Sequence, residues 1–454
     1  MKIRNLLLGS LAVAGLTTTG AYAADLGVLT SLDVCDSLGL SGLTISSDTN
    51  CLQITGEVKY KFIWGDYDVD GPSVGPTTVG FRGNDGFVDT VHGATDDSDN
   101  NDWDSRFDAW IKFVATADSD FGPAKAVLKL KQVDHDVTTN EDGTTIGSSD
   151  TGGVVLDEAY VSIGDSTKII AGKASSIMNK SDDAPLDWLG GFISADVDAG
   201  VSWGPADLPD GGHVIQVVSD LGNGITVSAG LENLNGSNDQ NADNAYGSAG
   251  TAVGVIAYKG DGISAHVTVA AGGVLDGEIE DWGVHAGFAG TFDNFKVVLA
   301  GAYGHDEGLG ALEDYWNVLA SASATFDMFT LAGSLEAKDD GVNDGWGGSA
   351  SVAFAVSDGV TLNVGGRWFD GTGAAGYHDG YQVAAGVAAE VTEGITLSGE
   401  VGYVNDDTAN DDLFYGKAKL EWAPGGDTFT SSLAGTVTSE NGYKIESEFK
   451  KTFQ

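Results

Sequence analysis

Side chains of two kinds alternate strictly along Cys51 to Tyr67, CLQITGEVKYKFIWGDY. One face of an extended chain would carry Ile54, Gly56, Val58, Tyr60, Phe62 and Trp64, and the other Thr55, Glu57, Lys59, Lys61 and Ile63. Successive side chains of a β-strand point to opposite sides of its sheet. The stretch therefore predicts a strand that separates an apolar phase from water, although a strand of a soluble sandwich would alternate in the same way.

Short turn motifs recur along the rest of the chain. The first, DSDFGP at 118–123, separates two alternating stretches at 106–117 and 124–133. Aspartate, glycine and proline supply the backbone geometry that tight turns need. Further turns are expected at GDST (164–167), DLGNG (220–224), KGDG (259–262), FDN (292–294), FDM (326–328), SDG (357–359), TEG (392–394) and PGGD (424–427). With one strand before the first hairpin and one after the last, these motifs give 20 strands.

Strands of about ten residues, joined alternately by short turns and longer acidic loops, are typical of an outer-membrane barrel. Lipid offers no hydrogen-bond partners, so every backbone group has to pair within the sheet and the sheet has to close. We therefore predict an all-β fold, a transmembrane antiparallel β-barrel with an even strand number of 16 to 20, over residues 52–454. The closing strand is expected at Tyr443 to Gln454.

The N-terminus and the composition limit the class of protein. Residues 1–23 combine a basic start, an apolar run and Ala21-Tyr22-Ala23, which predicts a secretory signal peptide. A formal net charge of -45 argues against a nucleic-acid partner, since phosphate backbones attract basic surfaces. Because 42% of the residues are hydrophobic, the acidic chain is nevertheless expected to fold.

The chain has two cysteines, Cys35 and Cys51. An isolated pair in an exported protein most often forms a disulfide. We expect the bond to pin residues 24–51 as a lead-in to the first strand, and metal binding by the pair is the weaker interpretation.

Three segments resemble the general porins of alphaproteobacterial outer membranes: CLQITGEV (51–58) with Cys35 before it, SRFDAWIKFVATADSDFGPAKAVLKL (105–130) and LDEAYVSIGDSTKIIAGKA (156–174). The resemblance implies a homotrimer whose barrels pass small solutes. It also implies that the strand ending at Gly172-Lys173 leads into a loop that folds inward and narrows the pore. The family has Gly-Arg there, usually 16 strands, and a terminal phenylalanine where this chain continues to Gln454.

Residues 174–212 form a long break in the strand pattern. From the residues alone, an inward loop and a loop on the outer surface are equally good interpretations, and the resemblance favours the inward one. In that position the loop would line the pore with the carboxylates of Asp182, Asp183, Asp187, Asp196 and Asp198.

Basic residues cluster near both ends of the chain, and pairing of the last strand with the first would place both clusters on one wall. The predicted basic lining is Lys59, Lys61, Arg106, Lys112, Lys125, Lys129, Lys131, Lys173, Lys417, Lys419, Lys444 and Lys450. A basic wall facing an acidic loop would sort solutes by charge. The acidic outer loops predict a weak cation preference at low salt.

These observations predict an outer-membrane porin, a passive channel in contact with outer-membrane lipid and lipopolysaccharide. No catalytic motif stands out, so neither an enzyme nor a cofactor is expected, beyond diffuse Ca²⁺ at acidic loops. The alternative is a secreted or surface-displayed β-rich structural protein or adhesin whose acidic loops bind calcium. Aromatic residues in the outward phase favour the channel, because a soluble protein would not expose them: Tyr60, Phe62, Trp64, Phe288, Trp316, Trp368 and Tyr403.

Overall fold

The computed structural model describes residues 32–66, 73–74, 77–78, 102–135, 153–178, 184–190, 211–234, 250–275, 277, 279, 281–306, 314–339, 344–372, 378–424 and 428–454. In this part of the chain, no helix is long and apolar enough to cross a membrane. The predicted signal peptide lies outside the described residues.

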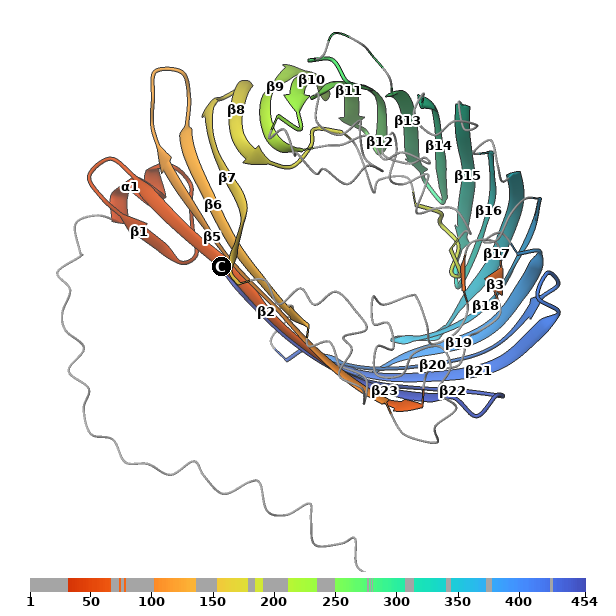
Figure 1. Ribbon diagram of the computed structural model, residues 1–454. Coiled ribbons are helices and arrows are strands. Elements are labelled where there is room, and N and C mark those ends of the chain that lie inside the picture. The colour runs from red at the N-terminus through yellow and green to blue at the C-terminus, as the bar shows by residue number, and fades with distance from the viewer. Residues whose placement is uncertain are drawn as a thin grey trace, which may run out of the picture.

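Twenty antiparallel strands form a closed barrel (Figure 1). They are β2 (Cys51–Asp66), β5 (Asp102–Ala117), β6 (Ala124–His135), β7 (Val155–Gly164), β8 (Thr167–Ala174), β9 (Gly212–Gly222), β10 (Ile225–Glu232), β11 (Thr251–Gly260), β12 (Ile263–Gly272), β13 (Asp281–Phe292), β14 (Phe295–Asp306), β15 (Asp314–Phe326), β16 (Phe329–Asp339), β17 (Asp344–Ser357), β18 (Val360–Thr372), β19 (Gly380–Thr392), β20 (Ile395–Asp406), β21 (Asp411–Trp422), β22 (Phe429–Thr438) and β23 (Tyr443–Phe453). The predicted fold class and the count of 20 strands are confirmed.

The barrel closes where the last strand pairs with the first. β23 runs antiparallel to β2, from Gly56 opposite Phe453 to Asp66 opposite Tyr443. The other edge of β2 pairs with β5. Each strand therefore has a partner on both sides, and the sheet leaves no open edge for lipid to meet.

The nine short turns stand where the sequence places them, each between two consecutive strands. At several of them an Asn or Asp adopts a positive φ, as Asn223 (53°), Asp261 (51°), Asp293 (49°) and Asp327 (51°) do. These side chains tolerate the left-handed region better than most, which is why they mark two-residue hairpins. The strands of the first hairpin are longer than expected, beginning at Asp102 and ending at His135.

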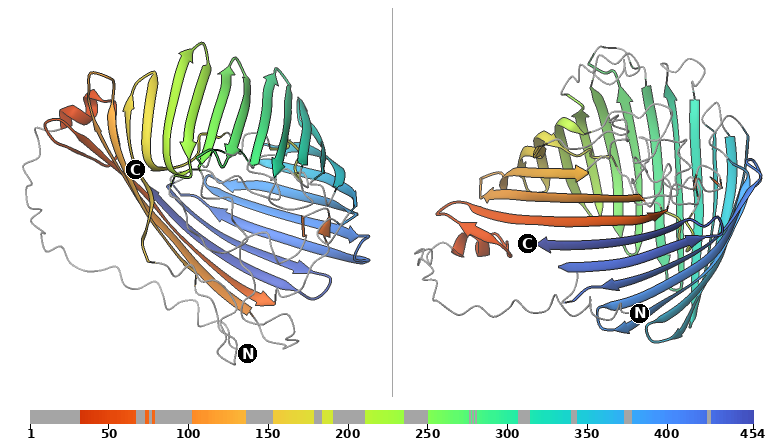
Figure 2. Two further views of the ribbon diagram at one scale, coloured as in Figure 1. Left: turned by 45° about the horizontal axis from the view of Figure 1, so that its top comes forward. Right: turned by 60° about the horizontal axis from the view of Figure 1, so that its bottom comes forward.

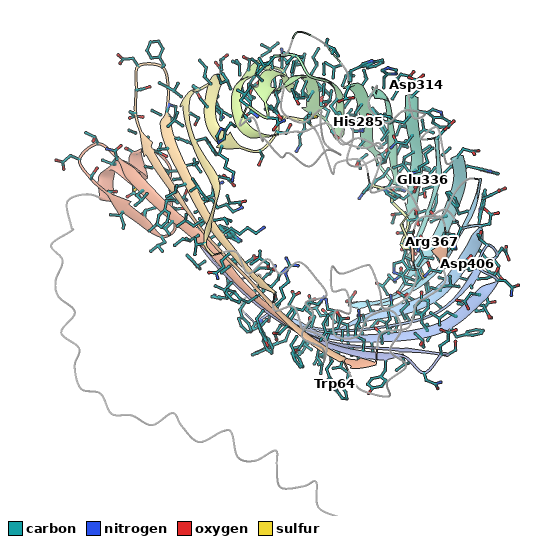
Figure 3. All side chains as sticks on the ribbon, in the orientation of Figure 1. Trp64, His285, Asp314, Glu336, Arg367 and Asp406 are labelled. Atoms are coloured by element: carbon teal, nitrogen blue, oxygen red, sulfur yellow. A yellow bond between two sulfur atoms is a disulfide. The ribbon has the colours of Figure 1, made fainter. Side chains whose placement is uncertain are left out.

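The two faces of the sheet meet different surroundings. In β15, Trp316, Val318 and Ala320 are exposed, while Tyr315, Asn317, Leu319 and Ser321 are buried. In β2 and β6, Val58 (51%) and Leu128 (40%) are exposed on the outside rather than packed in a core. Figure 3 shows Trp64 outside the barrel, and His285, Glu336 and Arg367 on the inner side. The barrel thus turns an apolar face outward and a mixed, mostly polar face inward.

Exposed aromatic residues form two bands on the outer face. Near the long-loop ends of the strands they are Trp282, Tyr303, Trp316, Trp346, Trp368, Tyr381 and Phe414, and near the short turns they are Phe292, Phe295, Phe326, Phe329 and Trp422. In β13 the bands are ten residues apart, roughly 26 Å along the barrel axis for a strand tilted by about 40°. That span matches the apolar band of membrane barrels.

A small N-terminal element lies beside the start of β2. It consists of α1 (Leu32–Ser37) and β1 (Thr44–Ser46), and β1 pairs with Cys51–Gln53. The element lies at the same end of the barrel as the C-terminus (Figure 2). A separate two-stranded ladder joins β3 (Ser73–Val74) to β4 (Thr77–Thr78).

Cys35 and Cys51 form a disulfide between α1 and the first residue of β2, with the Cα atoms 4.9 Å apart, so the predicted bond is confirmed. Replacing both cysteines by serine is expected to release residues 34–50 from β2 and leave the barrel closed, because the bond joins α1 to the first residue of β2 and crosslinks no two barrel strands. Closing so short a loop adds about 3 kcal/mol to the free energy of unfolding of the closed segment.

Hydrogen exchange would measure this effect, with faster exchange expected in residues 34–50 and unchanged exchange in β13–β16. Equal acceleration in both regions would contradict a local role for the disulfide.

Candidate functional site

The segment between Ala174 and Gly212 is here called the inner loop. Glu232 anchors its root, which is where the loop leaves the barrel wall and returns to it. This side chain is fully buried at the end of β10. Its Oε1 accepts from the backbone N–H of Ile177 (3.0 Å) and from Nε2 of Gln216 (2.8 Å). Its Oε2 accepts from the backbone N–H of Gly211 (2.8 Å). One carboxylate therefore joins the departing and the returning limb of the loop to the barrel wall.

Apolar contacts hold the described parts of the inner loop against the inner face of the barrel. Met178 is buried against Val253 and Val255 of β11 and Ala270 of β12. Further along, Leu186 packs on a cluster of Val298, Ala300 and Leu319 on β14 and β15. The described loop residues thus lie inside the barrel, as the inward interpretation requires.

A second polar anchor holds residues 186–188 against β15–β17. The carboxylate of Asp187 accepts from Oγ of Ser334 (2.9 Å) and Oγ of Ser349 (2.8 Å). The backbone N–H groups on either side also donate to serines, Leu186 to Ser321 and Trp188 to Ser351, both at 2.9 Å. Asp187 is only 7% exposed, so it contributes to attachment of the loop.

The ring of Trp188 lies directly over Gly386 of β19. A Cβ atom at that position would stand 2.7 Å from the indole, so the contact requires glycine. Nearby, Nε of Arg367 donates to Gln382 (2.7 Å), and Nε2 of Gln382 donates to the hydroxyl of Tyr415 (2.8 Å). This hydroxyl donates to Glu400 (2.7 Å), which gives a polar chain across β18–β21.

On the opposite wall, closure joins the two basic clusters. Lys59 of β2 stands opposite Lys450 of β23, and Lys112 of β5 stands opposite Lys129 of β6. Like charges directly across a ladder repel one another. The wall would therefore be strained unless carboxylates lay among the cations.

Within the described part of the chain, seven of the twelve predicted lining cations have a carboxylate within 4.0 Å. The pairs are Lys59–Asp108, Lys61–Glu446, Arg106–Asp108, Lys112–Glu158, Lys129–Asp157, Lys419–Glu421 and Lys444–Glu446. Most are half-buried. The wall is consequently a mixed field of ion pairs, with less net positive charge than a count of lysines indicates.

The remaining predicted cations have other surroundings. Nζ of Lys173 donates to the backbone oxygen of Leu156 (2.6 Å), and Lys417 lies over the ring of Tyr415, 5.0 Å from its centroid. Lys125, Lys131 and Lys450 lie on β6 and β23. The pore-lining role of these side chains stays a prediction.

A hollow of about 460 Å³ separates Trp188 of the inner loop from the charged wall. Its charged lining is Glu400, Lys417, Lys419, Lys444 and Glu446, so it brings three of the predicted cations opposite the loop. Among the predicted acidic lining residues, Asp182, Asp183, Asp196 and Asp198 lie outside the described residues.

The sequence analysis missed the residues that attach the loop. Glu232, Ser334 and Ser349 are not among the predicted site residues. A glutamate in an otherwise small and polar row, Thr226 and Ser228 before Glu232, was the one available signal. Among the described residues, no three His, Cys, Asp or Glu side chains gather as a metal site.

The sequence profile of the porin subfamily matches residues 31–427, most of the chain. The protein belongs to the porin family. A closed barrel with an apolar exterior, a charged interior and an internal loop is what an outer-membrane diffusion channel requires. This porin is therefore such a channel, and the alternative of a secreted surface protein is not favoured.

Solved structures with similar folds include OccAB4 of Acinetobacter baumannii, with 11% identity, a TM-score of 0.43 and coverage of 88% of this porin and 97% of that chain. OmpF of Salmonella typhi in complex with daunomycin has 11% identity, a TM-score of 0.41 and coverage of 90% and 100%. A triple mutant of Rhodopseudomonas blastica porin has 13% identity, a TM-score of 0.35 and coverage of 88% and 100%. A search of curated proteins found no match.

Proposed function

We propose that this porin passes ions and small hydrophilic solutes by passive diffusion through the gap between the inner loop and the wall of β20–β23. The observation that carries the proposal is the hollow between Trp188 and the charged wall. One side of the gap is fixed by the Asp187 and Glu232 anchors, and the other is a rigid sheet. Charges along such a gap act on solutes over a short distance with little intervening water.

Conductance across a planar lipid bilayer tests the proposal. Purified porin is expected to insert and produce stepwise, ohmic increases in current, because an open aqueous path needs no gating event. Failure of correctly folded, detergent-purified protein to raise the current would refute the channel.

Ion preference depends on the balance between the basic wall and the negative charge of the rest of the chain. The ion pairs cancel much of the basic wall, while the whole chain carries a net charge of -45. We therefore expect a weak preference for cations at low salt, with a permeability ratio of roughly a few-fold that declines as salt screens the charges.

Reversal potentials in a KCl gradient measure this permeability ratio. The measurement is made near 0.1 M salt, where the Debye length is about 10 Å, and again near 1 M, where it is about 3 Å. A clear anion preference at low salt would show that the basic wall controls selectivity instead.

The setting of the channel is also proposed. The porin lies in the outer membrane of a Gram-negative cell as a homotrimer, with lipid against the aromatic bands and lipopolysaccharide against the long-loop side. The two aromatic bands support the membrane position, and the family supports the trimer. The channel acts without catalysis or a cofactor. Gel mobility before and after heating would reveal a trimer that separates into monomers.

A further inference from the structure

A second hollow, of about 450 Å³, lies inside the barrel at the short-turn end, away from the charged wall. Leu186 of the inner loop forms one side, and β11–β14 form the rest. Ala289 and Val298 supply an apolar floor beside Leu186. A volume of this size is within the usual range for sites that bind small molecules.

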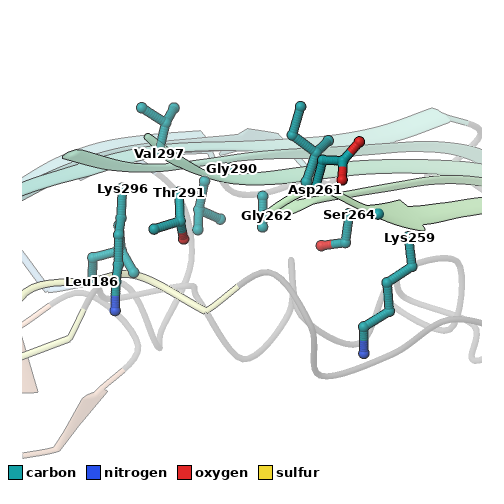
Figure 4. Close-up of a pocket in the computed structure, with 13 residues that line it drawn as sticks. Leu186, Lys259, Asp261, Gly262, Ser264, Gly290, Thr291, Lys296 and Val297 are labelled. Atoms are coloured by element: carbon teal, nitrogen blue, oxygen red, sulfur yellow. The ribbon is translucent and has the colours of Figure 1, made fainter. Parts of the chain in front are cut away.

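Two lysines flank this apolar floor. Figure 4 shows Lys259 and Lys296 extending to the same side of the sheet as Leu186, with Val297 on the opposite side. Both lysines are exposed. Within the described part of the chain, neither ammonium group has a carboxylate within 4.0 Å, unlike most cations of the opposite wall. Asp261 also belongs to the lining, but its carboxylate points away from both ammonium groups (Figure 4).

The strand register gives the spacing of the two lysines. Lys259 is level with Ser264, which is level with Ala289 on the next strand. Lys296 pairs with Thr291, two residues nearer the turn than Ala289. Three strand spacings separate β11 from β14, about 14 Å, and the offset of two residues adds about 7 Å along the strands, so the two side chains start about 16 Å apart, on either side of the floor.

From this arrangement we propose that the hollow is a binding subsite for amphipathic organic carboxylates inside the channel. The apolar body of such a solute would cover the half-buried Leu186 and Ala289, and its carboxylate groups would meet Lys259 and Lys296. Apolar contact supplies part of the affinity, and the exposed ammonium groups select for negative charge. The subsite holds these solutes at the short-turn mouth, although the channel as a whole prefers cations. The proposal of this subsite rests on the proposed function, because a solute reaches the hollow through the lumen of the channel.

Current recordings from the reconstituted porin test the subsite. Naphthalene-2,6-dicarboxylate, added in turn to each side of the bilayer in low-salt KCl, is expected to produce brief interruptions of the open-channel current. The frequency of interruptions should rise with concentration, and they should be more frequent from one side. The neutral diol naphthalene-2,6-dimethanol should interrupt the current far less, because it lacks the charges that the lysines attract.

The variant K259Q/K296Q should retain the open-channel conductance and bind the dicarboxylate about tenfold more weakly, since two exposed ion pairs with the solute are lost. The control variant K168Q/K451Q removes two other exposed lysines and should bind as the parent does. A conducting channel that the dicarboxylate never interrupts, or interrupts equally in K259Q/K296Q, would overturn the subsite and leave the channel intact. Absence of conductance would instead refute the proposed function.

Discussion

Replacing Glu232 by alanine is expected to release the root of the inner loop and make the loop accessible to protease. The carboxylate is fully buried and accepts hydrogen bonds from Ile177, Gly211 and Gln216. Alanine removes the acceptor of the two backbone N–H groups and of one amide hydrogen of Gln216, whose Nε2 still donates to the backbone oxygen of Ser175 (2.9 Å). Each such loss costs on the order of 1–3 kcal/mol, so the anchored state loses several kcal/mol relative to the released state.

Trypsin provides a direct measurement, because Lys180 is the single basic residue between Ala174 and Gly212. When opening is fast compared with cleavage, the cleavage rate follows the population of the open form. A loss of about 3 kcal/mol therefore raises the rate of cleavage after Lys180 by about a hundredfold. The single-channel conductance should change in the same variant, since the loop borders the gap.

Glu421 offers a matched control on the same barrel. It lies next to the end of β21 with 45% of its side chain exposed and pairs with Lys419 at 2.7 Å, so E421A removes a carboxylate with little effect on stability. Unchanged cleavage after Lys180 in E232A, or an equal rise in E421A, would show that Glu232 is not the anchor.

The barrel was predictable from sequence because its determinants are local. Alternation with period two marks a strand wherever lipid wets one face and water the other, and Asp-Gly or Asn-Gly motifs mark the turns. The chain repeats both signals from Cys51 to Phe453, so errors at single strands do not accumulate. Strand ends were less certain, as the extra residues from Asp102 in β5 show, because polar residues fit either a strand end or a loop.

The position of the inner loop was not predictable in the same way. The residues that attach it are distant in sequence: Ile177 and Glu232 are 55 positions apart, and Asp187 and Ser349 are 162 apart. Serine on the inner face of a strand looks the same whether it meets water or a loop. The residues alone therefore left two interpretations open, and the resemblance to a family was needed to choose.

The basic wall shows a related limit. Alternation predicted which face of the sheet the lysines occupy. The net charge that they give the wall, however, depends on carboxylates on the same face of neighbouring strands. Asp108 approaches Lys59 across β2 and β5, and Glu158 of β7 approaches Lys112 of β5 across the intervening strand. These partners could be counted in the sequence, but pairing required the register of the ladder. Charge along a barrel strand is therefore best assessed after the strands are paired.

Replacing Asp187 by alanine is expected to release the far end of the inner loop while its root stays attached. The carboxylate is buried against Ser334 and Ser349. Arg367 of β18 has Asp187, Glu336 and Glu400 among its electrostatic partners, so alanine also removes one of the negative charges around a buried guanidinium. Loss of the acceptor of the two buried serine hydroxyls costs on the order of 1–3 kcal/mol each, which matches or exceeds the roughly 1 kcal/mol expected from each of the backbone bonds at Leu186 and Trp188.

The predicted change is a broader distribution of single-channel conductances, because the segment that carries Trp188 would no longer hold one position at the gap. D187N is the matched variant: both serines donate to the same oxygen of Asp187, so an amide oxygen in that place still accepts from both but carries no charge. If the charge beside Arg367 matters, D187N should behave nearly as D187A does, whereas recovery of a single conductance level would assign the anchor to the serine hydrogen bonds. A single conductance level in both variants would contradict the anchor altogether, and the apolar contact of Leu186 with Val298 and Leu319 would then be what fixes the loop.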